Sequence, residues 1–156
     1  MNRKRGFTLI ELLVTISILG VLAALIAGNF ITSLKKGRDA RRKTDLEQIQ
    51  KAVEMYYEDK KAYPTFTFPF GSKLCETVNC VSGEKVYMQK VSNDPISGNT
   101  YVYQSSGTDY QLYSCIENSL DQGPGVNQSP GYSGKNCGSG VCNPCKYGIS
   151  SPNTTP

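Results

Sequence analysis

The chain has 156 residues, enough for one domain and an anchor, and 38% of them are hydrophobic and 19% charged. The net charge of +4, from 17 Lys and Arg against 13 Asp and Glu, gives no general attraction to nucleic acid. The chain contains no His, so the usual base for a Ser or Cys nucleophile is missing. Composition therefore argues against a hydrolase, and we expect no enzyme.

The first forty residues predict a short basic leader and a membrane anchor. Three basic residues at positions 3–5 come just before an apolar run, and no charged side chain occurs from Leu12 to Leu34. A bilayer is crossed by about 20 apolar residues, so this run fits a spanning helix better than the core of an ordinary signal peptide. Cleavage by a conventional signal peptidase remains an alternative, because the run contains the small residues Ala23, Ala24 and Ala27.

Glu11 is the unusual residue of the apolar run. A carboxylate in hydrocarbon costs at least about 2.5 kcal/mol, so Glu11 should have a partner or lie among the lipid headgroups. Cleavage after Gly6 would expose a new α-amine on Phe7, which a neighbouring subunit could bring to Glu11. A buried pair of this kind fixes register more than it adds stability. Its position alone leaves both interpretations open.

The segment from Gly6 to Leu12, Gly-Phe-Thr-Leu-Ile-Glu-Leu, resembles the class III signal of type IV prepilins and of type II secretion pseudopilins. The resemblance implies cleavage between Gly6 and Phe7 by prepilin peptidase, N-methylation of Phe7 and a role for Glu11 in assembly. It also implies a homo-oligomeric helical filament and a membrane assembly platform as partners. One departure is Gly28, which stands where many family members carry Pro.

The charges around the span do not favour the orientation that the leader implies. More Lys and Arg follow the span, at positions 35–43, than precede it, so the positive-inside rule would keep the back end inside. The leader requires the back end of the chain to lie outside, and so do the cysteines that this back end contains. We therefore expect a single-pass precursor in the cytoplasmic membrane, surrounded by lipid and with its head outside. After assembly it would belong to an extracellular filament or a periplasmic pseudopilus.

An amphipathic helix is predicted to continue over residues 35–63. Its end is expected near Tyr63, because Pro64 disfavours helical geometry in the residue before it. Apolar side chains recur at steps of three and four residues, at Leu46, Ile49, Val53 and Tyr56.

The charges of this helix are segregated, with basic residues at 35–43 and acidic residues at 45–59. We interpret them as solvated faces with local ion pairs. One alternative sets the basic band of one subunit against the acidic band of another. A second alternative is contact with lipid phosphates or DNA, and DNA is the weaker choice because no aromatic residues alternate with the basic ones.

Beyond Pro64 the sequence predicts a small antiparallel sheet. Strand-like runs cover 86–91, 101–104 and 110–116, with a hairpin turn at Ser105–Thr108 between the last two. The remaining segments, 64–85 and 117–156, are expected to be long loops, and the last residues are expected to fray.

All six cysteines lie in this head, at Cys75, Cys80, Cys115, Cys137, Cys142 and Cys145. An even number behind an apolar span predicts disulfides formed in an oxidising compartment. A zinc site is the alternative, because Cys142 and Cys145 form a C-x-x-C, but a second such pair is missing. The spacing favours a bond from Cys75 to Cys80, whose loop is short and turn-like.

The predicted fold class is α+β, with a long N-terminal helix packed on a small antiparallel sheet and disulfide-tied loops. Its parts are a leader (1–6), a transmembrane and assembly helix (7–34), an amphipathic helix half (35–63) and a globular head (64–156). The resemblance to pilins and to the major pseudopilin extends more loosely over 44–64 and 94–114, and implies the pilin fold. It is absent from the Cys-rich tail.

Major pseudopilins bind calcium in a late loop, and Glu117 and Asp121 lie in about the right region. The ligands do not match residue by residue, so we expect no cofactor. We interpret the chain as a structural pilin of a type IV pilus-like filament that supports adhesion, motility or DNA uptake. The alternatives are a type II secretion pseudopilin, a monomeric signal-anchored extracytoplasmic binding protein and, more remotely, a secreted thiol enzyme.

Overall fold

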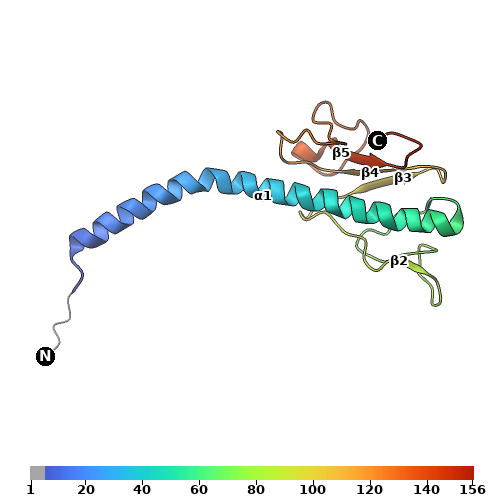
Figure 1. The fold of residues 1–156 in the computed structure, drawn as a ribbon, viewed down its shortest axis with the longest axis horizontal. Helices are drawn as coiled ribbons and strands as arrows, with labels where there is room; N and C mark the ends of the chain where they lie inside the picture. Colours follow the sequence, from blue (N-terminus) through green and yellow to red (C-terminus); the bar gives the residue numbers. More distant parts are fainter. Residues whose placement is uncertain (1–5) are drawn as a thin grey trace. The chain divides into compact units, whose positions relative to one another are not determined.

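The computed structural model describes residues 6–156, except for the side chains of Ala27 and Asn29, so most of the predicted leader lies outside it. The chain forms one long helix followed by short strands (Figure 1). The elements are α1 (Leu9–Lys60), β1 (Leu74–Cys75), β2 (Val86–Met88), β3 (Val102–Ser105), β4 (Tyr110–Ser114), a 3-10 turn η1 (Gly140–Cys142) and β5 (Tyr147–Ser150). The predicted α+β class is confirmed.

Helix α1 begins and ends slightly inside the predicted range of 7–63. Thr8 precedes its first residue as the N-cap, and the helix runs on through Gly28. It ends at Lys60 because Lys61 adopts a left-handed conformation with φ of 55° and donates its N–H to the Tyr57 carbonyl at 2.7 Å. This is the αL termination of a helix, which satisfies one of its last carbonyls.

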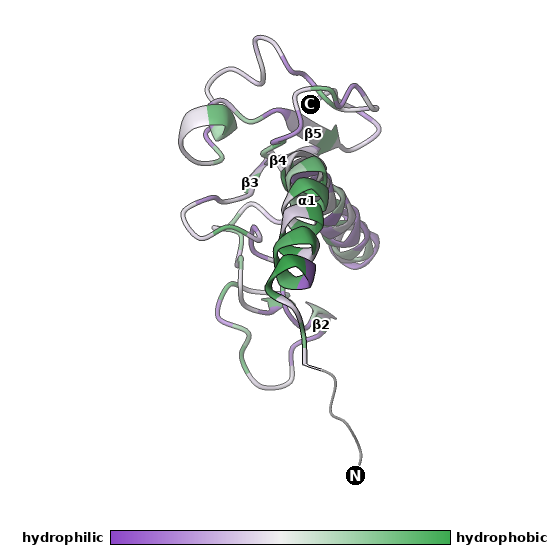
Figure 2. Ribbon diagram, turned by 90° about the vertical axis from the view of Figure 1, so that its left-hand side faces the viewer, coloured by the Kyte–Doolittle hydropathy of each residue, from purple (hydrophilic) through white to green (hydrophobic). Residues whose placement is uncertain are grey.

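The first part of the chain, up to Lys35, forms a unit of its own, distinct from the unit that starts at Lys36. Within it, α1 is predominantly hydrophobic (Figure 2). Over 18 residues the mean hydropathy reaches 2.6, and none of that stretch is buried. By length and composition, this is the one helix in the described part of the chain that could cross a membrane.

The amphipathic half of α1 carries the core of the head. Leu46, Ile49 and Val53 are completely buried, as the three-and-four spacing predicts. They pack with apolar residues from the sheet and loops, among them Leu112 and Ile116. Burial of a Leu, Ile or Val side chain contributes about 1.5–3 kcal/mol each, so this stripe holds the head on the helix.

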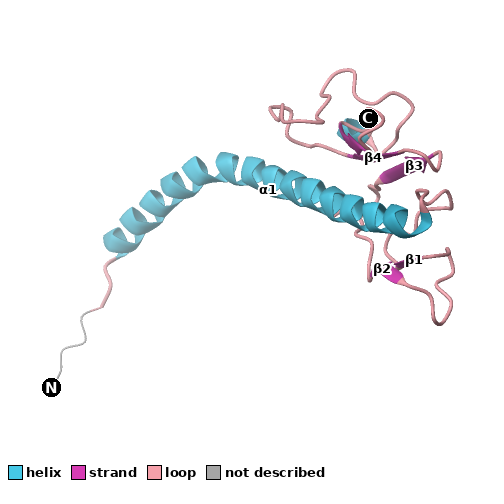
Figure 3. Cartoon of the chain, turned by 45° about the vertical axis from the view of Figure 1, so that its right-hand side comes forward, coloured by secondary structure: helices cyan, strands magenta, loops and turns pink. Residues whose placement is uncertain are grey.

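Two small sheets lie on opposite sides of α1 (Figures 1 and 3). Strands β3, β4 and β5 form an antiparallel sheet in that order, with Gln104 opposite Gln111 and Leu112 opposite Ile149. Strands β1 and β2 form an antiparallel pair. Strand β3 is therefore an edge of the larger sheet.

Strand β5 and the tail correct the expectation of a loop over 117–156 with a frayed end. Gly148 interrupts the strand-like sequence pattern of β5. Glycine is needed there because a Cβ would come within 3.0 Å of the Tyr113 ring. The tail is held as well, because Gln111 Nε2 donates to the Thr155 carbonyl at 2.7 Å and Ser151 is buried.

Three disulfides tie the loops of the head. They join Cys75 to Cys80, Cys115 to Cys142, and Cys137 to Cys145. The two cysteines of the C-x-x-C are thus bonded to different partners, which disagrees with both a zinc site and a redox pair. The prediction of disulfide-tied loops is confirmed.

Candidate assembly and processing site

Glu11 is held at the start of α1 by a reciprocal contact with Thr8. The Thr8 N–H and its Oγ1 both donate to Glu11 Oε2, at 2.9 and 2.7 Å, and the Glu11 N–H approaches Thr8 Oγ1 at 3.4 Å. This is a capping box, in which a Thr at the N-cap and a Glu three residues later satisfy each other's backbone donors. A carboxylate at this end of a helix is also favoured by the helix dipole.

The capping box leaves part of the Glu11 carboxylate available. Within residues 6–156, its second oxygen, Oε1, accepts no hydrogen bond, and the side chain is exposed. Sequence reasoning overlooked Thr8, although Thr-x-x-Glu before an apolar run signals this cap. The ion pair between Glu11 and a Phe7 amine involves a second subunit and stays a prediction.

Gly6 and Phe7, the predicted cleavage point, both lie outside α1 and are exposed, Phe7 by 79%. Irregular, exposed backbone of this kind is accessible to a peptidase. The apolar residues that follow are also uncovered, with exposed fractions from 43% at Leu34 to 82% at Leu9. An apolar surface this extensive marks a site of contact with lipid or with other protein.

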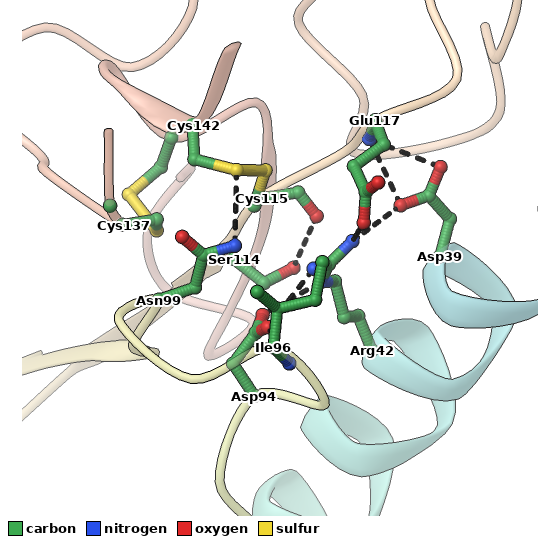
Figure 4. The surroundings of a disulfide bond; sticks show 12 residues. Asp39, Arg42, Asp94, Ile96, Asn99, Ser114, Cys115, Glu117, Cys137 and Cys142 are labelled. Atoms are coloured by element: carbon green, nitrogen blue, oxygen red, sulfur yellow. Dashed lines mark hydrogen bonds and ion pairs between the residues drawn. A yellow bond between two sulfur atoms is a disulfide. The ribbon is translucent and has the colours of Figure 1, made fainter. Parts of the chain in front are cut away.

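A buried cluster of ion pairs joins the second half of α1 to two loops of the head (Figure 4). At its centre lies Arg42, whose side chain is 0% exposed. Its Nε and Nη2 donate to the two oxygens of Asp94, at 2.6 and 3.0 Å, and its Nη1 donates to Asp39 at 2.8 Å and to Glu117 at 2.7 Å. We call these four residues the Arg42 clamp.

Further contacts satisfy the remaining acceptors of the clamp. Asp39 accepts the backbone N–H groups of Glu117 and Asn118, at 2.8–3.1 Å. Arg38 forms a bidentate pair with Glu117, at 2.6 and 2.9 Å. The Arg38 contact, reinforced by Arg42, lowers the pKa of Glu117 from 4.5 to about 2. Contacts with these carboxylates also raise the pKa of Arg42, against the effect of its burial.

The Arg42 clamp corrects the interpretation of positions 35–43 as a solvated basic face for Arg38 and Arg42. Lys35, Lys36 and Arg41 are exposed, as that interpretation expects. Asp94 accepts the Ile96 N–H at 2.8 Å, as a turn residue does, and its side chain is fully buried against Arg42. The Arg42–Asp94 ion pair joins residues 52 positions apart, so the local sequence pattern does not predict it. The clamp fixes the head to α1, and the Cys115–Cys142 disulfide anchors the strand end that leads into Glu117.

The two carboxylates considered for calcium are both occupied by cations of the chain. Glu117 lies against Arg38 and Arg42, and Asp121 accepts from Lys43 Nζ at 2.7 Å. A divalent cation at either carboxylate would have to displace a side-chain ion pair. Across residues 6–156, no group of three or more acidic, Cys or His residues is arranged to hold a metal. Glu117 and Asp121 are thus each paired with cations of the chain in this structure.

Comparisons with known proteins agree with the arrangement of helix and head. A prokaryotic N-terminal methylation motif matches residues 1–27, and the family described as type II secretion system (T2SS), protein G, matches residues 29–130. No solved structure matches significantly.

Curated relatives fall into two groups. Type II secretion system core protein G of Vibrio cholerae serotype O1 is 31% identical over 110 residues, 69% of this chain and 75% of that protein. Its namesake in Pseudomonas aeruginosa is 33% identical over 123 residues, 72% and 83% of the two chains. Type IV major pilin protein PilA of Myxococcus xanthus is 36% identical over 69 residues, 44% and 31% of the two chains.

The protein G match covers more than half of the chain and takes in both the second half of α1 and most of the head. The methylation motif covers the capping box and the apolar run as far as Ala27. The chain thus belongs to the T2SS protein G family, a family of pilin and pseudopilin subunits that build filaments and are not known as enzymes.

Proposed function

We propose that this chain is a filament subunit made as a membrane-anchored precursor. A prepilin peptidase cuts it between Gly6 and Phe7 and methylates the new amine of Phe7. The exposed backbone at both residues supports this step. Residues 1–6 then act as the leader, 7–34 as the transmembrane and assembly helix, 35–63 as the scaffold and 64–156 as the head.

The observation that carries the proposal is the uncovered apolar surface of α1. Large apolar side chains from Leu9 to Leu34 remain exposed in the single chain. Lipid covers this surface in the cytoplasmic membrane, with the head outside. In a filament, the same helices of other copies cover it by close packing. A membrane assembly platform moves the subunit from the first setting to the second.

Glu11 sets the register of this packing. Thr8 uses one carboxylate oxygen, and the other is free to meet the Phe7 amine of a neighbouring subunit. In an apolar filament core such a charge pair is strongly favoured over two unpaired charges, so mismatched registers are excluded. The cap positions the Glu11 side chain for this contact and leaves its carboxylate negatively charged.

Two changes at Glu11 separate the cap from the charge. Glu11→Gln keeps a capping acceptor at the third helical position but loses the charge, and Glu11→Ala loses both. Each variant replaces the native copy in the host, and sheared surface or periplasmic filaments are measured by immunoblot. We expect both variants to be processed. Both should yield on the order of tenfold fewer filaments, because each loses the charge pair between neighbouring subunits.

Glu47→Ala is the matched control, because Glu47 is also an exposed glutamate of α1 and forms no ion pair within residues 6–156. It should assemble normally. If Glu11→Ala also assembles normally, Glu11 does not set the register. If the native chain itself yields no filaments, it is better described as a monomeric, signal-anchored binding protein. If only Glu11→Gln assembles normally, the cap matters and the charge does not.

The filament is either a type IV pilus-like fibre for adhesion, motility or DNA uptake, or a pseudopilus for protein secretion. The second role is favoured by the names of most relatives and by their coverage, 75% and 83% of two core proteins G against 31% of the pilin. Deleting the gene distinguishes the roles. Loss of secreted proteins with surface fibres intact supports secretion, and the reverse supports a pilus.

A further inference from the structure

A groove of about 840 Å³ runs along the free edge of the larger sheet. One wall is the segment that follows α1, residues 64–70, and the other is formed by residues 101–106 of strand β3 and its flanks. The floor is aromatic, because the Phe68 and Tyr103 rings lie 4.2 Å apart between centroids. The Tyr63 N–H closes one end by donating to the Gly107 carbonyl at 2.8 Å.

The wall formed by β3 has backbone groups without partners. The Ser151 N–H donates to the Tyr110 carbonyl, so the backbone groups of Tyr110 face β5. Because these groups alternate along a strand of an antiparallel sheet, those of Gln111 face β3 and pair with Gln104. In β3, the groups of Tyr103 and Ser105 must then point away from β4, toward the open edge.

The opposite wall is similar. In the part of the chain that the structure describes, the backbone of residues 65–67 makes no hydrogen bond with other backbone, and neither do the outward groups of Tyr103 and Ser105. Unpaired N–H and C=O groups at a sheet edge form a template for a further strand. Residues 65–67 line the groove opposite this edge, and their backbone groups are likewise without backbone partners among residues 6–156.

The side chains of the groove restrict what can enter. Its polar lining consists of hydroxyls, the amides of Gln104 and Gln111, and one carboxylate, Asp109, with no Lys or Arg among the lining residues. One cation, Lys135 Nζ, donates to Gln104 Oε1 and is balanced by Asp109, so the groove lacks the excess positive charge that attracts phosphates and nucleic acid. The aromatic floor and the unpaired backbone edge of β3 suit an extended peptide, and Asp109 suits a basic side chain on it.

We propose that this groove binds an extended segment of a different polypeptide, which adds a strand to the open edge of β3. The six residues from Tyr101 to Ser106 would pair with five or six residues of the partner, a length of about 17–20 Å. This chain is a poor source of that strand, because its tail is bonded to Gln111 and its long loops are closed by disulfides. The proposal does not depend on filament assembly.

The test measures amide hydrogen exchange of the full-length chain, kept monomeric in detergent micelles. The probe is a capped peptide of alternating Thr and Val that ends in Lys, and its control is the same peptide fully N-methylated. Without peptide, the Tyr103 and Ser105 amides should exchange faster than those of Val102 and Gln104. The probe should slow Tyr103 and Ser105 on the order of tenfold or more, and the N-methylated control should not.

Three other results would overturn the proposal. Equal binding of the N-methylated peptide, or protection of the same amides by maltohexaose and not by the peptide, would show that backbone pairing is not what the groove recognises. Protection of Tyr103 and Ser105 that appears without peptide as protein concentration rises would show that a second copy fills the groove.

Asp109→Asn tests the preference for a basic residue. The variant keeps the oxygen that accepts from Ser106 Oγ, so the hairpin should stay intact. Affinity for the Lys-ended peptide should fall about two- to fivefold, while a Gln-ended peptide binds both proteins equally. Equal affinity of both proteins for the Lys-ended peptide would overturn the role given to Asp109.

Discussion

Replacing Arg42 by Met should destabilise the head more than any other single change of a charged residue. The Arg42 and Asp94 side chains are both 0% exposed, and Arg42 is the sole cation in contact with Asp94 within residues 6–156. Met fills similar space but leaves Asp94 buried and unpaired. Removing one partner of a buried pair costs about 3–5 kcal/mol, a large share of the 5–15 kcal/mol typical of a domain.

The assay is denaturant unfolding of the oxidised full-length chain in micelles at neutral pH, followed by circular dichroism. Arg42→Lys keeps the charge but not the bidentate fork to Asp94, so its loss should lie between wild type and Arg42→Met. Arg41→Met is the surface control, since Arg41 is 66% exposed and lies 3.9 Å from Asp45, and it should cost less than about 1 kcal/mol. A loss that small for Arg42→Met would refute the clamp.

Three further predictions concern the head. Because Arg38 and Arg42 lower the pKa of Glu117 from 4.5 to about 2, its contribution is complete above pH 4.5 and is lost as the pH falls toward 2. Unfolding measured across that range should show a loss of about 3 kcal/mol, and Glu117→Gln should flatten the curve. Removing the Cys75–Cys80 bond, with a separation of 5 residues, should cost about 2 kcal/mol, against about 3.5 for Cys115–Cys142, with a separation of 27. Thermal unfolding of the paired Ala variants checks the order, and a reversed order would show that loop entropy is not decisive. Gly125→Ala should destabilise the head by more than Gly134→Ala, although both have φ of +74°. A Cβ at Gly125 would clash with the Gly148 carbonyl, whereas one at Gly134 meets nothing within 4 Å. Equal melting temperatures of these two variants would contradict the packing argument.

The sequence was informative wherever structure is periodic or local. The apolar run and the three-and-four spacing of Leu46, Ile49 and Val53 predicted α1, because a helix repeats its buried face at that interval. The aromatic and β-branched runs predicted strands β2, β3 and β4. Strand β5 could not be recognised, since Gly148 is needed for close approach to Tyr113 and breaks the pattern.

Long-range polar contacts were not predictable in the same way. Arg42 and Asp39 look like ordinary surface charges of a helix, and their roles appear only once Asp94 and Glu117 are placed beside them. Six of the ten Tyr side chains are buried, which composition alone does not indicate. The capping role of Thr8, by contrast, could have been recognised from Thr-x-x-Glu.

The most direct test of the central claim is the intact mass and N-terminal peptide of the protein in sheared filaments from its native host. We expect a chain that begins at methylated Phe7, has every cysteine oxidised and sediments with the filaments. A chain that still begins at Met1, or one cut near Ala27 and recovered only as a soluble monomer, would contradict processing at Gly6 and assembly through α1.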